Sequence, residues 1–174
     1  ISKARTVYNN IKATHNLVNI QQAKGKDFEI RDDGYCYIMT YSFPCQDLSL
    51  AGKRKGMADT STRSGMLWEV ERILNEMDVK PDVLLMENVP QVHSKDNMEH
   101  FNRWQRALEQ MGYKNYWQDL NAKNYGIPQN RDRTFMVSVK GNYNYQFPKP
   151  VNLKLRLKDM LEEEVDDKSL MSET

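Results

Sequence analysis

Apolar residues recur along this chain in two patterns, one typical of strands and one typical of helices. Residues 35–41 (YCYIMTY) form a run of aromatic, β-branched and apolar side chains, and residues 82–86 (DVLLM) form a shorter one. A third run lies at 134–139 (TFMVSV). Short apolar runs of this kind predict strands that are buried in a sheet.

Between these runs, apolar residues three and four positions apart predict amphipathic helices. One such face comprises Met66, Leu67, Val70, Ile73, Leu74 and Met77, and a second comprises Met98, Phe101, Trp104, Leu108 and Met111. Pro81 ends the first helical element, and Gly112 stands where a left-handed cap is expected after the second. Residues 3–14 are a further helix candidate. The alternation predicts an α/β fold, a three-layer, doubly wound, mainly parallel sheet covered by helices.

Length and charge narrow this picture only a little. The 174 residues suffice for one domain with a core, and 25 basic against 24 acidic residues give a net charge of +1. Overall charge therefore neither requires nor excludes a nucleic-acid partner, but positive charge gathers locally at 53–55 with Arg63. We expect one domain over 1–161 and a solvated acidic tail over 162–174.

The cysteines and histidines point to a reducing compartment and to no metal. Cys36 and Cys45 are the only cysteines, no secretion signal is present, and no apolar run is long enough to span a membrane. We therefore expect a cytoplasmic protein without a disulfide framework. Cys36, inside a strand pattern, is expected to be a small buried hydrophobe. His15, His93 and His100 form no metal-ligand spacing.

Reactive side chains stand at the ends of the predicted strands. Cys45 closes the segment Ser-Phe-Pro-Cys after the first strand, Glu87 follows the second, and Arg131 and Arg133 precede the third. In open α/β sheets, ligands bind beyond the carboxyl ends of the strands. A cysteine thiolate is the best nucleophile among side chains at neutral pH, so Cys45 is the candidate nucleophile.

A cysteine, a glutamate and paired arginines suit covalent attack on a cytosine ring. The thiolate would add to C6 while the acid form of Glu87 bonds N3, and an arginine would hold O2 and orient the carboxylate. C5 could then take a methyl group from a sulfonium donor, and loss of the C5 proton would expel the cysteine. The base must first leave the duplex, and the basic loop 46–62 has the composition of a segment that closes over it.

Structural interpretations of the same residues stay open at this point. Glu87 could cap the next helix, and the arginines could be a solvated strand edge bonded to Asp132. An unrelated cysteine hydrolase would need a base near Cys45, for which His93 or His100 is available.

The motifs together resemble the DNA (cytosine-5)-methyltransferase family, in its bacterial and phage restriction-modification form. The matching segments are Phe43-Pro44-Cys45-Gln46, Glu87-Asn88-Val89 and Gln129-Asn130-Arg131-Asp132-Arg133, and the segments 121–128 (NAKNYGIP) and 147–150 (FPKP) around the last motif agree as well. The resemblance covers about residues 16–161. It implies a partial Rossmann-like fold and S-adenosylmethionine as cofactor.

The resemblance also assigns roles by position. Cys45 would attack C6, Glu87 would contact N3 and the exocyclic amine, Arg133 would contact O2, and Arg131 would support the site. The cofactor pocket would be lined by Asn19, Phe43, Pro44 and Met66. Double-stranded DNA would be contacted by Gln46, Ser49, Lys53, Arg54 and Lys55.

The chain departs from the family pattern in three ways. It has no Gly-x-Gly turn or acidic ribose ligand, and Asn19 stands where an aspartate is usual, so its carbonyl could accept a hydrogen bond without charge. It also lacks the target-recognition half. We expect a central catalytic fragment that is weak or inactive alone, partnered by the missing segments or a cognate restriction enzyme. The alternatives are a non-catalytic remnant that binds DNA or a partner, and a tRNA cytosine-5 methyltransferase.

Overall fold

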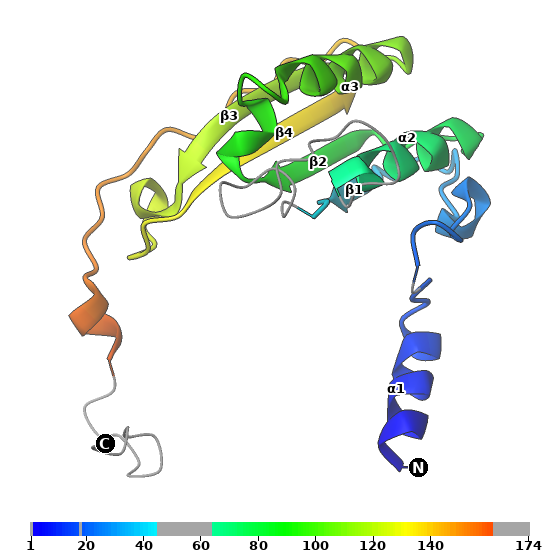
Figure 1. Cartoon of the computed structure of the whole chain (residues 1–174), viewed down its shortest axis with the longest axis horizontal. Coiled ribbons are helices and arrows are strands. Elements are labelled where there is room, and N and C mark those ends of the chain that lie inside the picture. Colours follow the sequence, from blue (N-terminus) through cyan, green and yellow to red (C-terminus); the bar gives the residue numbers. More distant parts are fainter. Residues whose placement is uncertain (1, 18, 45–63, 162–174) are drawn as a thin grey trace.

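A computed structural model of the chain describes residues 2–17, 19–44 and 64–161 (Figure 1). Its centre is a four-stranded sheet in the order β1-β2-β4-β3. The strands are β1 (Ile38–Tyr41), β2 (Val83–Asn88), β3 (Tyr113–Asn121) and β4 (Asp132–Lys140). The α/β class predicted from the sequence is confirmed.

Two helices, α2 (Leu67–Glu76) and α3 (Met98–Gln110), build the core on one face of the sheet. Alternate residues of β2 point toward them, so Leu84 and Met86 are fully buried, whereas Val83 and Leu85 on the opposite face are half-buried. Trp104 of α3 donates a hydrogen bond from its ring N–H to the Tyr41 hydroxyl at 2.9 Å, which ties α3 to β1.

The remaining elements are short or stand apart. Helix α1 (Ser2–Ala13) extends away from the sheet (Figure 1), and its residues are largely exposed. Single 3₁₀ turns occupy Gly25–Phe28, Ser64–Met66, Pro90–His93, Ala122–Tyr125 and Leu157–Met160. Within the described ranges, no helix is both long enough and apolar enough to cross a membrane.

The sheet differs from the prediction in its strand directions. Strand β1 is parallel to β2, but β4 is antiparallel to both β2 and β3. The connections explain this, because α2 provides the crossover that a parallel pair needs, whereas β3 and β4 are joined directly through residues 122–131. Residues of both core helices join one hydrophobic cluster with Leu84 and Met86 of β2.

Two sequence expectations for single elements also need correction. Strand β3 was not predicted, and β1 begins at Ile38 rather than at residue 35. Cys36 therefore lies before the strand and is exposed, not buried. The cap after α3 is as predicted, because Gly112 adopts a left-handed φ of 90°.

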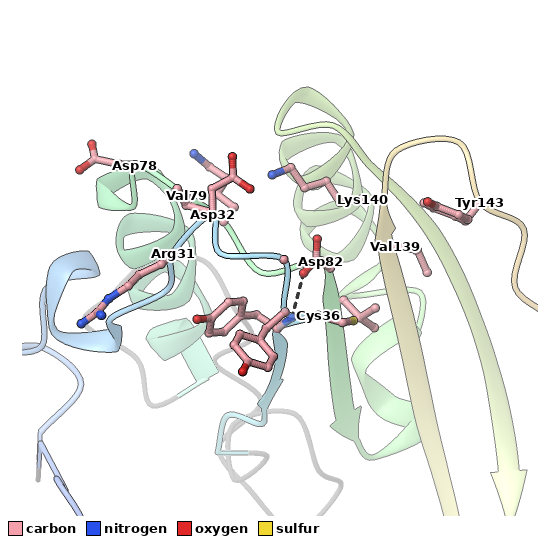
Figure 2. A pocket seen from close by; sticks show the side chains of 14 residues that line it. Arg31, Asp32, Cys36, Asp78, Val79, Asp82, Val139, Lys140 and Tyr143 are labelled. Atoms are coloured by element: carbon pink, nitrogen blue, oxygen red, sulfur yellow. Dashed lines mark hydrogen bonds between the residues drawn. The ribbon is translucent and has the colours of Figure 1, made fainter.

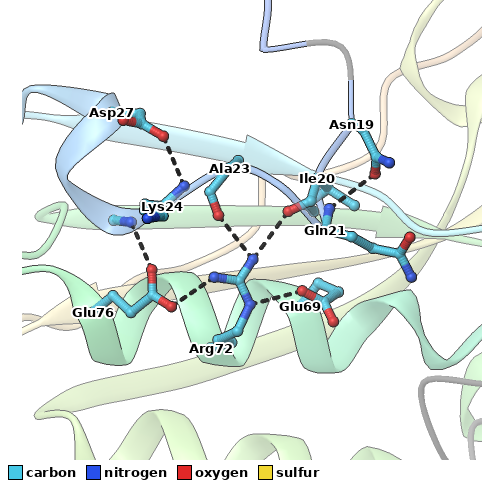
Figure 3. A network of polar contacts seen from close by, with 10 residues as sticks. Asn19, Ile20, Gln21, Ala23, Lys24, Asp27, Glu69, Arg72 and Glu76 are labelled. Carbon is cyan, nitrogen blue, oxygen red and sulfur yellow. Dashed lines mark hydrogen bonds and ion pairs between the residues drawn. The ribbon is translucent and has the colours of Figure 1, made fainter.

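The segment before β1 is fastened to α2 by one arginine (Figure 3). The Arg72 guanidinium donates to the backbone carbonyls of Ile20 and Ala23, at 3.0 and 2.8 Å, while it pairs with Glu69 and Glu76 on its own helix. Glu76 in turn accepts a hydrogen bond from the Gly25 N–H at 3.0 Å. A Cβ on Gly25 would lie 2.7 Å from the backbone of Glu76, so this close approach requires glycine.

Candidate active site

The reversed direction of β4 brings two sequence-distant motifs to one edge of the sheet. Strand β2 ends with Glu87 and Asn88, and β4 starts at Asp132. In the antiparallel register Glu87 lies opposite Phe135 and Asn88 lies opposite Thr134. Glu87 and Arg133 consequently project from the same face at the same edge.

Glu87 is the centre of a charged cluster at this edge. Its Oε1 lies 2.8 Å from Nε of Arg133 and 3.9 Å from Nη2 of Arg131. Its Oε2 accepts a hydrogen bond from the Ser42 hydroxyl at 3.5 Å. The side chains of Glu87 and Arg133 are 36% and 24% exposed, so a ligand can reach the pair. Contacts with Ser42 and Arg133 on its two oxygens orient the Glu87 carboxylate.

Asn88 fixes the chain that leads toward the candidate nucleophile. It is buried, its amide N–H donates to the Phe43 carbonyl at 3.1 Å, and its carbonyl oxygen accepts from the Val89 N–H at 2.9 Å. The end of β1 is thereby held beside the end of β2. Cys45 itself lies outside the described residues, as do the predicted DNA contacts Gln46, Ser49, Lys53, Arg54 and Lys55.

A cavity of about 390 Å³ adjoins the charged cluster. Its charged lining consists of Glu87, Arg131 and Arg133, and its other walls are Leu120, Ala122, Tyr125, Phe135 and Pro148. Apolar walls with a few convergent polar groups are typical of pockets that bind small ligands or single groups of a larger one.

The alternatives that the sequence left open for these residues can be compared with the contacts. The turn Pro90–His93 after β2 has Val89 at its N-cap position and no side-chain cap, and α3 has none either, so Glu87 does not serve as one. Arg133 pairs with Glu87, and it meets Asp132 only through that residue's backbone carbonyl at 2.7 Å. His93 contacts Asp119 of β3 at 3.0 Å and stacks on Trp117, whereas His100 lies on α3.

The predicted cofactor residues lie in different environments. Asn19 is exposed beside a cavity of about 380 Å³ whose walls include Leu17, Ile20, Ala23 and Phe28. Its side-chain oxygen accepts from the Gln21 N–H at 3.0 Å. Pro44 is exposed and Met66 is half-buried against the core, but Phe43 is only 5% exposed and presents little side-chain surface to a ligand.

A larger cavity, of about 660 Å³, lies at the opposite end of the sheet (Figure 2). It includes Arg31, Cys36, Lys140 and Asp82, whose carboxylate already accepts the Tyr37 N–H at 2.8 Å. This is the amino end of the parallel pair β1 and β2, whereas ligands of α/β sheets bind at the carboxyl ends. We therefore assign the candidate site to the other end of the sheet, where β2 ends with Glu87.

The fold of this chain is that of methyltransferases. A solved structure of the Dnmt2 methyltransferase of S. pombe matches with a TM-score of 0.64 and 25% identity, over 88% of this chain and 48% of that one. A putative DNA modification methyltransferase encoded within an E. coli prophage matches with a TM-score of 0.62 and 20% identity, over 85% of this chain and 42% of that one. The latter likeness concerns the fold alone.

The sequence comparison then defines the family. The family model for C-5 cytosine-specific DNA methylases matches residues 1–174, and the chain belongs to this family. It is 47% identical over 131 residues to the type II methyltransferase M2.ScrFI of Lactococcus lactis subsp. cremoris, covering 74% of the chain and 36% of that protein. It is 39% identical over 173 residues to the orphan methyltransferase M.SssI of Spiroplasma monobiae, covering 93% of the chain and 44% of that protein. The chain thus spans less than half the length of these curated relatives.

Proposed function

We propose that this chain carries the catalytic centre of a DNA (cytosine-5)-methyltransferase. The reaction would move a methyl group from S-adenosylmethionine to C5 of a cytosine that has been turned out of duplex DNA. The observation that carries the proposal is the contact of Glu87 with Arg133 and Arg131 at the sheet edge, beside the segment that leads to Cys45. Membership of the cytosine-specific family supports the choice of base.

The reaction begins with the Cys45 thiolate, which forms a bond from sulfur to C6 of cytosine. The electron pair of the C5–C6 double bond shifts toward C4 and N3, and the acid form of Glu87 donates its proton to N3 to offset the charge that develops there. C5 would then bond to the methyl carbon while the bond between that carbon and the sulfonium sulfur of the donor breaks, and the electron pair would stay on the sulfur as a neutral thioether. A base removes the C5 proton, the double bond re-forms, and the bond between C6 and the Cys45 sulfur breaks to regenerate the thiolate.

The arginines orient the groups that react. The Arg133 guanidinium, 2.8 Å from the Glu87 carboxylate, sets the direction of that carboxyl group and supplies N–H donors for O2 of the base. Arg131, at 3.9 Å, adds a second positive charge on the same oxygen. Donors fixed in place before the reaction stabilise developing charge better than mobile water does.

The cavity beside Asn19 fits the purine end of the cofactor. Leu17, Ile20 and Phe28 supply apolar walls for a flat ring, and Asn19 is among the polar residues that line the rest of the cavity. Asn19, Pro44 and Met66 would hold S-adenosylmethionine, which supplies an electrophilic methyl group when bound. Because residues 1–161 contain no Gly-x-Gly turn, we propose that they form only part of the catalytic domain.

The test is a covalent trap. The 174-residue chain is mixed with S-adenosylmethionine and a duplex that carries 5-fluorocytosine at many positions, because fluorine at C5 blocks the final elimination. Cys45→Ala is the control for the nucleophile, and an RNA of the same sequence is the control for the substrate. A chimera in which this chain replaces the matching part of M.SssI repeats the assay with a complete protein.

A denaturation-resistant adduct that depends on Cys45, in the chain or in the chimera, is the expected result. An adduct in the chimera alone would mean that this chain needs the other segments of a complete methyltransferase to react. That result would still support the catalytic role of Cys45. The absence of an adduct in both proteins, or an adduct with RNA alone, would overturn the proposal.

A further inference from the structure

Asn121, the last residue of β3, is a buried polar residue whose side chain is fully used. Its carbonyl oxygen accepts the backbone N–H groups of Lys123 and Arg131, at 3.1 and 3.3 Å. Its amide N–H groups donate to the side chains of Asn130 and Asp132, at 2.7 and 2.8 Å. An asparagine offers two donors and two acceptor positions, so this side chain closes residues 122–131 from both ends.

The position of these bonds matters because they hold the backbone on both sides of Arg131, directly before Arg133. Asn121 lies directly opposite Asp132 in the β3–β4 register, so the two side chains share one face of the sheet. Arg133 therefore points to the other face, where Glu87 stands. A slip of β4 by one residue relative to β2 would turn Arg133 away from Glu87, and the bonds of Asn121 hold the residues at which β4 begins.

The side-chain bonds of Asn121 lie at one end of the β3–β4 pairing. Strand β4 begins at Asp132, between the two arginines, and its pairing with β3 ends there. The ends of paired strands open more readily than their centres. The Asn121 side chain adds hydrogen bonds at this end of the strand pair, and its carbonyl oxygen also accepts the Arg131 N–H.

We infer that Asn121 is the positioning residue that sets Arg131 and Arg133 against Glu87. Asn121 acts through the backbone of Arg131 and through Asp132, and it does not itself contact the cavity. This inference concerns the geometry of the site, and its importance for catalysis rests on the function proposed above.

The experiment measures the order of the Arg133 side chain in the full chain by nuclear magnetic resonance. The Nε–H signal of Arg133 is assigned by its loss in Arg133→Lys, and its heteronuclear NOE is compared with that of Arg106, an exposed arginine of α3. The variants are Asn121→Ala, Asn121→Asp and the exchange Asn121→Asp with Asp132→Asn. Asn124→Ala is the matched control, because Asn124 lies in the same turn and accepts the Val151 N–H through its backbone carbonyl.

We expect Asn121→Ala to reduce the Arg133 NOE toward that of Arg106 and to speed exchange of the Arg131 amide by about tenfold or more, the effect of one or two lost hydrogen bonds. Asn121→Asp places a second carboxylate against Asp132 and should loosen Arg133 as well. The double variant, Asn121→Asp with Asp132→Asn, again places an amide donor opposite a carboxylate acceptor at positions 121 and 132. It should therefore restore the order of the Arg133 side chain.

An unchanged Arg133 NOE in both single variants, or an equal loss in Asn124→Ala, would overturn the inference. If Asn121→Ala does not fold, the double variant decides, because a mobile Arg133 in that folded protein would contradict the inference. The readout needs neither DNA nor cofactor, so a failed adduct assay leaves this inference standing, and failure here leaves the adduct assay informative.

Discussion

Glu87 and Asn88 are neighbours at the end of β2, but they point to opposite faces and have different roles. Glu87 is half-exposed and contacts Arg133, Arg131 and Ser42, so its surroundings orient a carboxylate toward the cavity. Asn88 is buried and joins the end of β2 to the Phe43 carbonyl. These contacts fit Glu87 for the proposed chemistry and Asn88 for the structure that holds it.

Replacing Glu87 by glutamine tests the first role. Glu87→Gln keeps the shape of the side chain but removes its acidic proton and its charge. We expect adduct formation with the 5-fluorocytosine duplex to slow by about 10² to 10⁴-fold, the usual contribution of a positioned general acid. Stability should change by at most about 1 kcal/mol, since the ion pair with Arg133 is partly exposed.

The matched control for this substitution is Glu99→Gln on the exposed side of α3, which should alter neither quantity. Rates of adduct formation and urea unfolding curves measure the two effects. Equal rates in Glu87→Gln and the unsubstituted protein would contradict the role of Glu87.

Replacing Asn88 by alanine tests the second role. The change leaves the Phe43 carbonyl and the Val89 N–H without their partner in a buried place. We expect a loss of about 1–3 kcal/mol in the free energy of unfolding, measured in urea. Asn102→Ala, at an exposed site on α3, is the comparison, and a similar loss there would show that burial of Asn88 is not the cause.

At the scale of elements, α2 does more than cover the sheet. Its buried face contributes Leu67, Val70, Ile73 and Leu74 to the core, while Arg72 and Glu76 on its outer side hold the backbone of residues 20–25. The turn that carries Asn19 is therefore fixed by a helix about fifty positions later in the sequence. The packing of α2 consequently determines where this candidate cofactor residue lies.

Gly25→Ala tests this docking. The added Cβ would lie 2.7 Å from the backbone of Glu76 and Met77, and a backbone cannot yield as a flexible side chain can. We expect a loss of about 1–3 kcal/mol, together with faster amide exchange over residues 19–28. Lys26→Ala, in the same turn but exposed, should leave both measurements unchanged, and equal behaviour of the two variants would contradict the close approach.

At the scale of the whole molecule, two buried tyrosines join the elements. Tyr41 of β1 accepts the Trp104 N–H of α3, and Tyr113 at the start of β3 donates to the Pro81 carbonyl at 2.6 Å. Burial raises the pKa of both hydroxyls above the usual value, and the nearby charge of Asp82 adds to the effect on the pKa of Tyr113. Each hydroxyl therefore keeps its proton longer in the folded protein than in the unfolded chain.

This difference predicts a loss of stability in alkali. Below the unfolded tyrosine pKa of about 10, both states hold these protons and the stability is fully present. Above it the unfolded chain releases protons that the folded protein retains, so the free energy of unfolding should fall by up to about 1.4 kcal/mol per pH unit for each tyrosine. Urea unfolding between about pH 9 and pH 11 measures the slope.

Tyr113→Phe should reduce this slope, whereas Tyr35→Phe, at a side chain that is 76% exposed, should leave it as it is. A slope that is the same in all three proteins would mean that the buried hydroxyls do not govern the alkaline transition.

The sequence by itself determined most of the local elements and supplied the candidate reactive groups. Helical spacing located α2 and α3 within a few residues, because an amphipathic face repeats where the helix does. Strands β2 and β4 were predicted from apolar runs, but β3 was not. Its nine residues (YKNYWQDLN) lie at the edge of the sheet and are half polar, so they form no such run.

The tertiary structure decided how those pieces face one another. Only the antiparallel entry of β4 brings Arg133 to Glu87, and only the β3–β4 register gives Asn121 its partners at both ends of the turn. The exposed position of Cys36 and the burial of Phe43 are decided in the same way. The physical reason is that periodicity reports which side of an element is apolar, whereas strand direction, register and the partners of a polar side chain depend on residues distant in the sequence.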